Sequence, residues 1–188
     1  MNIKRHVICL WLLIGTLAFP AVAAANCNEA AYNQFDFWLG EWQVFNETKP
    51  LGSNVASQAS NNSPSATSKI TKILGNCSIL EEYQTTSGFI GKSLNIFDKQ
   101  KNAWHQTWVD NSGLLLQLDG KFENNVMVLQ GVITNKDGAK VEQKISWQAL
   151  ENGDVRQIWE QRNSGGDWQI LFNGRYVKTE TVVSSGGQ

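Results

Sequence analysis

The sequence has few of the residues on which charge-driven or metal-dependent functions rely. Its 16 Lys and Arg stand against 17 Asp and Glu, and the basic residues form no cluster along the chain. Nucleic acids and anionic membranes are bound by concentrated positive charge, so neither partner is expected. Only two histidines are present, and one of them, His6, lies in the N-terminal segment that precedes the apolar stretch. His105 and two cysteines are too few for a zinc site, and we predict no metal or other cofactor.

A long apolar run occurs only at the N-terminus. Lys4 and Arg5 precede an apolar stretch over residues 7–19, and small residues occupy positions 21–25. This order is typical of a cleaved export signal, and the apolar stretch is too short for a retained membrane anchor. We therefore predict a signal peptide over residues 1–25 and a periplasmic or secreted protein without a membrane span after cleavage.

The cysteines are also few. Of the three in the sequence, Cys9 would leave with the signal peptide, and Cys27 and Cys77 would remain. An even pair in an oxidising compartment favours a disulfide. Such a bond would close a loop of roughly fifty residues and contribute about 4 kcal/mol by restricting the unfolded chain.

The remaining chain has the size of one domain. Residues 26–47 predict a short helix followed by the first strand. Residues 48–68 are rich in Ser, Asn and Ala, and almost no large apolar residue occurs among them. They predict a flexible loop or insertion within the domain, because they cannot form a core element. Residues 69–180 would complete the β-domain, and residues 181–188 would form a disordered tail.

Turn-forming residues punctuate the chain from residue 69 onward. Ser87-Gly88 and Asn124-Asn125 are two examples, and such turns recur roughly every ten residues without helical periodicity between them. Short strands joined by tight turns indicate an antiparallel meander, either a sandwich or a barrel. No Greek-key connection is visible in the pattern. We therefore expect an all-β, up-and-down barrel of about ten strands with a short N-terminal helix.

Three of these strands have a glutamine among large residues on one face. Period-two alternation places each set on one side of the sheet, and the apolar sets must point inward. A buried amide without a partner costs about 1–3 kcal/mol, so a fully packed core would not favour glutamine there. Amides beside indole rings could instead orient a small amphipathic or aromatic ligand inside the barrel. The predicted ligand-binding residues are Trp104, Gln106, Trp108, Gln143, Trp147, Gln157 and Trp159. Trp168, Ile170 and Phe172 are expected to share a further inward face.

Two alternatives stay open. The glutamines could bond to one another or to buried waters in a solid barrel, and the protein would then be a structural or protein-interaction module. An enzyme acting on a small periplasmic substrate is the other alternative, but no G-x-S-x-G motif is present.

No catalytic residue is predicted. His105 is expected on the outer face, Glu81 and Glu82 are expected to be surface charges, and Asp36 is expected to cap the turn that follows it. An inward-pointing carboxylate would favour the enzyme. The candidates for it are Glu81, Glu82, Asp110 and Glu160.

The run Phe35-Asp36-Phe37-Trp38-Leu39-Gly40-Glu41-Trp42 resembles the opening of an uncharacterised bacterial family of calycin-like (lipocalin-like) proteins, a domain of unknown function. Similar motifs follow in the same order at residues 74–77, 93–98, 104–110, 155–160 and 172–176. The resemblance implies a small antiparallel β-barrel and no established activity.

The resemblance also implies how one end of the barrel closes. Gly40 would lead into the first strand, and Trp42 would close the barrel end beneath Arg175, with Lys178 as the alternative cation. The related haem-binding nitrobindins ligate iron through a His near the C-terminus. This chain has no His there, so haem binding is not expected.

Overall fold

The computed structural model describes residues 27–47 and 63–179. The predicted signal peptide, most of the predicted 48–68 loop and the predicted 181–188 tail lie outside the described residues. The described chain forms ten strands. They are β1 (Gly40–Asn46), β2 (Ala66–Ile73), β3 (Ser78–Thr85), β4 (Ile90–Asp98), β5 (Ala103–Asp110), β6 (Leu115–Glu123), β7 (Val126–Thr134), β8 (Lys140–Ala149), β9 (Val155–Asn163) and β10 (Gln169–Lys178).

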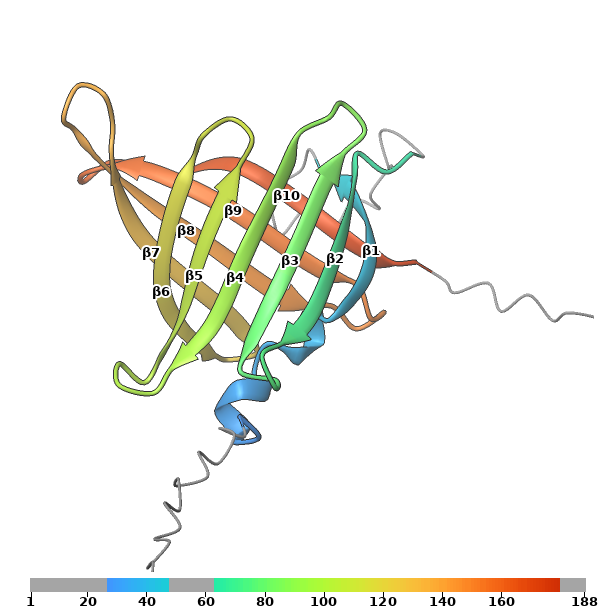
Figure 1. Cartoon of the computed structure of the whole chain (residues 1–188). Coiled ribbons are helices and arrows are strands. Elements are labelled where there is room, and N and C mark those ends of the chain that lie inside the picture. The colour runs from blue at the N-terminus through green and yellow to red at the C-terminus, as the bar shows by residue number, and fades with distance from the viewer. Residues whose placement is uncertain (1–26, 48–62, 180–188) are drawn as a thin grey trace, which may run out of the picture.

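Each strand pairs in antiparallel fashion with its neighbours in the chain, and β1 also pairs with β10. The sheet therefore closes into an up-and-down barrel (Figure 1), which confirms the predicted fold class. Asn124 and Asn125 both have positive φ in the β6–β7 turn, the backbone that joins tightly paired strands without splaying them. Within the described strands, closure leaves no edge unpaired.

Strand β2 begins at Ala66, so residues 66–68 belong to a strand rather than to the predicted loop. Ala66 and Ser68 are buried on the inner face at 1% and 2% exposure. Both side chains are small, and the absence of large apolar residues concealed the start of this strand.

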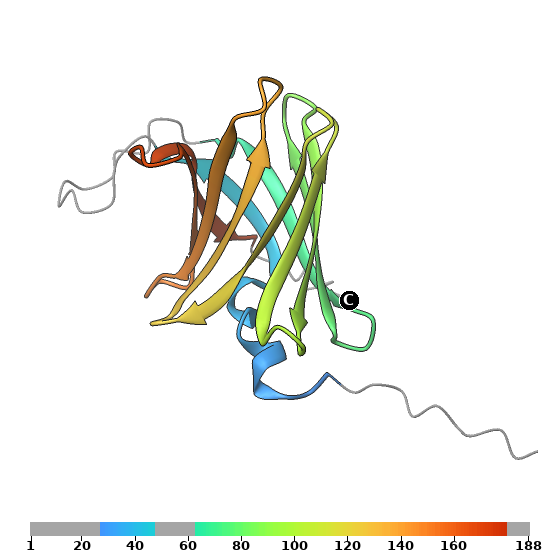
Figure 2. The same ribbon diagram turned by 90° about the vertical axis from the view of Figure 1, so that its left-hand side faces the viewer.

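Two 3₁₀ helices, η1 (Ala30–Asn33) and η2 (Asp36–Trp38), lie beneath one end of the barrel (Figures 1 and 2). They match the predicted short N-terminal helix. Neither these turns nor any other helix in the described residues has the length and apolar character of a membrane-spanning helix. The predicted disulfide joins Cys27 to Cys77 with a Cα–Cα distance of 4.9 Å. This disulfide ties the N-terminal segment with η1 and η2 (residues 27–39, the helical segment) to the turn between β2 and β3.

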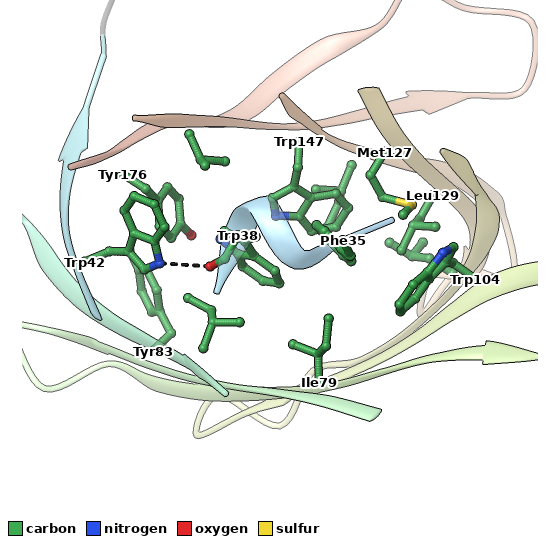
Figure 3. Packing of buried hydrophobic residues seen from close by; sticks show 14 of the residues in the cluster. Phe35, Trp38, Trp42, Ile79, Tyr83, Trp104, Met127, Leu129, Trp147 and Tyr176 are labelled. Carbon is green, nitrogen blue, oxygen red and sulfur yellow. Dashed lines mark hydrogen bonds between the residues drawn. The ribbon is translucent and has the colours of Figure 1, made fainter. Parts of the chain in front are cut away.

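The helical segment inserts aromatic rings into the barrel end (Figure 3). Phe35 and Trp38 are fully buried and stack with a centroid distance of 4.9 Å. Phe35 also meets Trp104 at 5.6 Å and Trp147 at 5.2 Å, both edge-on. Such edge-on contacts add about 0.5–1.5 kcal/mol each beyond the area that they bury. We call Phe35, Trp38, Trp104 and Trp147 the aromatic plug.

Asp36 does not cap the turn as predicted. The N–H of Leu39 bonds to the backbone carbonyl of Asp36, while the carboxylate lies 2.8 Å from Lys72 Nζ on β2. The side chain therefore anchors the helical segment to the barrel wall instead of satisfying backbone donors.

Trp42 lies on the inner face of β1, and its indole N–H donates to the carbonyl of Trp38 at 2.9 Å (Figure 3). The ammonium of Lys178, its register partner in β10, lies 5.3 Å from the indole centroid. Arg175 instead pairs with Phe45 in register and lies 5.6 Å from that ring. The prediction that Arg175 covers Trp42 is wrong, because an offset of three residues places Arg175 and Lys178 on opposite faces of the strand.

Strand β10 is irregular near its start. The pairing with β9 shifts between Ile170 and Phe172, which marks a β-bulge. Phe172 packs into the interior, Ile170 is 50% exposed, and Trp168 lies against the cationic groups of Lys144 and Arg162. The predicted common inward face of Trp168, Ile170 and Phe172 is therefore wrong, because a bulge breaks the period-two alternation.

Phe35→Ala should destabilise the barrel strongly, because it removes the ring at the centre of the plug. We expect a loss of about 3–5 kcal/mol in the free energy of unfolding, as for other buried Phe truncations. Phe45→Ala is the matched control, because Phe45 is only half-buried, on the outer face. Urea denaturation with the disulfide intact measures both, and equal losses would contradict a central role for Phe35.

Candidate functional site

A cavity of about 230 Å³ lies inside the barrel. It reaches toward the β3–β4 turn, which lies at the end of the barrel opposite η1 and η2 (Figure 1). Thr85 and Phe89, which flank the β3–β4 turn, contribute to its wall, and so does Leu171, which is 46% exposed. The cavity therefore reaches the surface at this end. A closed apolar cavity of about 150 Å³ is sufficient to hold benzene. The lining residues are Glu81, Tyr83, Thr85, Phe89, Gln106, Trp108, Leu116, Ile145, Gln157, Trp159, Leu171, Phe172 and Tyr176.

Four of the seven predicted ligand-binding residues meet at this cavity. Gln106 and Trp108 reach it from β5, and Gln157 and Trp159 reach it from β9. These pairs are far apart in the sequence, and barrel closure brings them to one space.

The other three predicted residues do not line the cavity. Trp104 and Trp147 belong to the aromatic plug, where both contact Phe35. Gln143 is 1% exposed and accepts a hydrogen bond from the indole N–H of Trp159 at 2.8 Å. Gln143 therefore helps to hold Trp159, a residue of the cavity wall, in place.

The three glutamines bond to other side chains rather than to one another. Gln106 donates to the Asn95 side-chain oxygen at 2.9 Å, and Gln157 accepts a hydrogen bond from the hydroxyl of Tyr176. Among the described residues, the amide nitrogen of Gln143 is left without a partner.

Glu81 lines the cavity, and the prediction that it is a surface charge is wrong. It is 2% exposed on the inner face of β3. Ser68 donates to Oε1 at 3.1 Å and Ser93 donates to Oε2 at 2.9 Å. No cation within residues 27–47 and 63–179 forms a salt bridge with it. Burial raises the pKa of Glu81 to about 7, although the two serine hydrogen bonds act in the opposite direction.

The sequence contains a signal that could have found Glu81. Ile79 and Tyr83 share its parity, and both are buried on the inner face. The two consecutive carboxylates make this pattern hard to recognise, because adjacent residues of a strand face opposite sides and one carboxylate must lie on the outer face. Glu82 does so and pairs with Lys92 at 2.7 Å.

The other carboxylates considered for an inward position are engaged elsewhere. Asp110 accepts from the indole N–H of Trp108 and from the Ser112 hydroxyl, and Glu160 pairs with Lys144 at 2.7 Å.

A hydrogen-bonded chain extends from Glu81 along the inner face. Asn95 donates to the Ser93 hydroxyl at 2.9 Å and accepts from Gln106. The residues of this hydrogen-bond network come from the adjacent strands β2 to β5, so main-chain pairing fixes the spacing between them. Such a network fixes the orientation of the carboxyl group before any ligand arrives.

Glycines let two aromatic wall residues lie close to the sheet. A Cβ at Gly91 would lie 2.1 Å from the Trp108 ring, and one at Gly174 would lie 2.4 Å from the Phe172 ring. Only a residue without a side chain fits at these positions. The wall rings are therefore placed by backbone shape as well as by packing.

Burial also acts on the two tyrosines nearest to Glu81. It raises the pKa of Tyr83 to about 12 and that of Tyr176 well above its ordinary value, and the charge of Glu81 adds to both shifts. Both phenols therefore stay neutral at physiological pH, and Glu81 is the group of the cavity that can change charge there.

His105 lies on the outer face, as the alternation predicts. Its Nδ1 is 2.7 Å from Asp119 and its Nε2 is 3.0 Å from the Thr107 hydroxyl. A base between a carboxylate and a hydroxyl is the arrangement that activates a nucleophile. The cavity lies on the other side of the sheet, however, and none of these three side chains lines it.

Neither a scan against protein-family models nor a search of curated proteins returns a match for this chain. The calycin-like resemblance therefore stays a prediction. The function has to be inferred from the geometry of the cavity.

Glu81→Gln should change the pH dependence of stability. The carboxyl of Glu81 has a pKa of about 7 when folded, against an ordinary value of 4.5. Between these values the unfolded state releases its proton first, so the wild type should lose about 3 kcal/mol of stability as pH rises from 4.5 to 7, and no more above 7.

Glu81→Gln lacks this loss. The difference in the free energy of unfolding, variant minus wild type, should therefore be about 3 kcal/mol larger at pH 8 than at pH 4.5. Urea denaturation at both pH values measures the difference. Glu82→Gln, on the outer face of the same strand, is the control and should show no such gain. Parallel profiles for the wild type and Glu81→Gln would contradict a buried, titrating Glu81.

Proposed function

We propose that this protein is exported and binds a small, largely apolar molecule non-covalently inside the barrel. The observation that carries the proposal is the buried carboxyl of Glu81, held by two serines and facing a cavity walled by aromatic rings. Small-molecule sites combine an apolar wall with a few polar groups that set orientation. Glu81, Gln106 and Gln157 are such groups here.

The energetics favour binding over a solid interior. A carboxyl buried without a cation costs stability, and Leu or Val at this position would avoid that cost. Groups that violate the rules of core packing in this way concentrate at functional sites. A structural module with a filled barrel would need neither the carboxyl nor the open space beside it.

The size of the cavity limits the ligand. Its volume of about 230 Å³ suits a molecule with one or two rings and a short substituent. The exposed side chain of Leu171 marks the end through which such a molecule would enter. The Cys27–Cys77 disulfide supports the exported location, because structural disulfides persist in oxidising compartments.

An enzyme is the second candidate, and one observation favours it. Glu81 points inward, and a carboxyl with a pKa of about 7 is suited to act as a general acid or base. Prolonged incubation of the protein with a bound ligand, followed by mass spectrometry of that ligand, separates the two functions. Unchanged ligand mass supports a binding protein, whereas a Glu81-dependent product supports catalysis.

Leu116→Trp should weaken binding by filling part of the cavity while leaving its polar residues unsubstituted. Leu116 is 1% exposed and lines the cavity, whereas Leu115, the adjacent residue, is 56% exposed on the outer face. With indole as the probe in isothermal titration calorimetry, we expect affinity about millimolar or tighter for the wild type. The affinity should fall at least about tenfold in Leu116→Trp and stay unchanged in Leu115→Trp. Equal affinities in the two variants would contradict a site inside the barrel.

A further inference from the structure

The charges inside the barrel are unbalanced. Among the residues that the structure describes, Glu81 is the one carboxylate that lines the cavity, and the lining contains no Lys, Arg or His. We infer that the ligand is a small organic cation, in which an ammonium group on a short apolar or aromatic body pairs with Glu81. This inference rests on the proposed function and adds the chemical class of the ligand.

The carboxyl group has unused capacity to accept hydrogen bonds. Each of its oxygens accepts one serine hydroxyl, from Ser68 and from Ser93. An ionised carboxylate offers about four acceptor positions, so roughly two remain toward the cavity. An ammonium group brings three donors and one positive charge, which supplies what the buried carboxylate lacks.

The rings around Glu81 suit the same ligand. Tyr83, two residues further along β3 on the same face, is edge-on to Trp108 at 6.2 Å and to Phe172 at 6.5 Å. Aromatic faces attract cations, and cages of such rings are a known means of recognising organic ammonium groups. An anionic ligand would instead meet a like charge in a space of low polarity.

The charged groups around this part of the barrel leave Glu81 available. Lys69 pairs with Glu41 at 2.9 Å, and Lys92 pairs with Glu82; both pairs are solvent-exposed. Lys72 shares the inward parity of β2 but is held at the plug end by Asp36 and Asn33.

Inside the described part of the barrel, the charge of Glu81 raises the pKa of two phenols, which stay neutral. They are Tyr83 on β3 and Tyr176 on β10. On β10, Arg175 points outward and binds Glu47 and Asp154. Asp110, at the end of β5, is bonded to Trp108 and Ser112.

Two probes of the same shape test the inference. 2-Phenylethylamine is cationic at pH 8, and 2-phenylethanol is its neutral analogue. In isothermal titration calorimetry at pH 8, the amine should bind the wild type at least about tenfold more tightly, as expected for a desolvated charge pair. Glu81→Gln should remove this preference and leave the affinity for the alcohol within about twofold. Glu82→Gln, the control from the outer face, should keep the preference.

Proton release gives an independent readout. Glu81 is protonated below its pKa of about 7, so a cation must displace that proton when it binds. Affinity for the amine should therefore rise about tenfold per pH unit up to pH 7 and level off above it. At pH 6, the binding enthalpy should depend on the ionisation enthalpy of the buffer in the wild type. Glu81→Gln should show no buffer dependence.

The outcomes separate this inference from the proposed function. Equal affinities for the amine and the alcohol overturn the cationic ligand and leave small-molecule binding in place. Tighter binding of the alcohol at pH 6 than at pH 8 also overturns it, because a protonated Glu81 would then be donating to a neutral ligand. If neither probe nor indole binds the wild type, the proposed function fails as well.

Discussion

Packing of Phe35 and Trp38 into one end of the barrel is the contact on which the rest of the interior depends. Eight strands already leave an interior just wide enough for side chains, so a ring of ten needs additional material or stays partly hollow. The helical segment supplies that material at one end only, where its rings meet Trp104 and Trp147 (Figure 3). The disulfide and the Asp36–Lys72 ion pair hold the segment against the wall. The other end is left to the cavity.

The plug end and the cavity end of the barrel interior therefore have different roles. The plug end is rich in aromatic residues, and its buried area stabilises the fold. The cavity end contains a carboxyl group, serines and amides in one hydrogen-bonded chain, which lowers stability relative to an apolar core. A stable plug makes that loss tolerable. Division of this kind is consistent with a scaffold at one end and a binding site at the other.

Side-chain parity was predictable from the sequence, and it was correct for most strands. The inward faces of Trp104–Gln106–Trp108, of Gln143–Trp147 and of Gln157–Trp159 all follow from period-two alternation. Parity says which face a residue occupies but not its height along the barrel axis. For that reason Trp104 and Trp147 were assigned to the ligand, although they lie at the plug. For Trp168 the parity prediction itself failed, because the extra residue of the β10 bulge reverses the inward and outward faces of the residues that precede it.

The sequence by itself determined a ten-stranded antiparallel barrel, a disulfide between Cys27 and Cys77, and an unusual glutamine pattern on the inner face. Only the tertiary structure decided which side chains meet. Ser68, Glu81 and Ser93 come from three strands, and strand register alone sets them within hydrogen-bond distance. Register also placed Lys178 rather than Arg175 over Trp42. The physical reason is that alternation is a local property of one strand, whereas register and height depend on how all strands close into a ring.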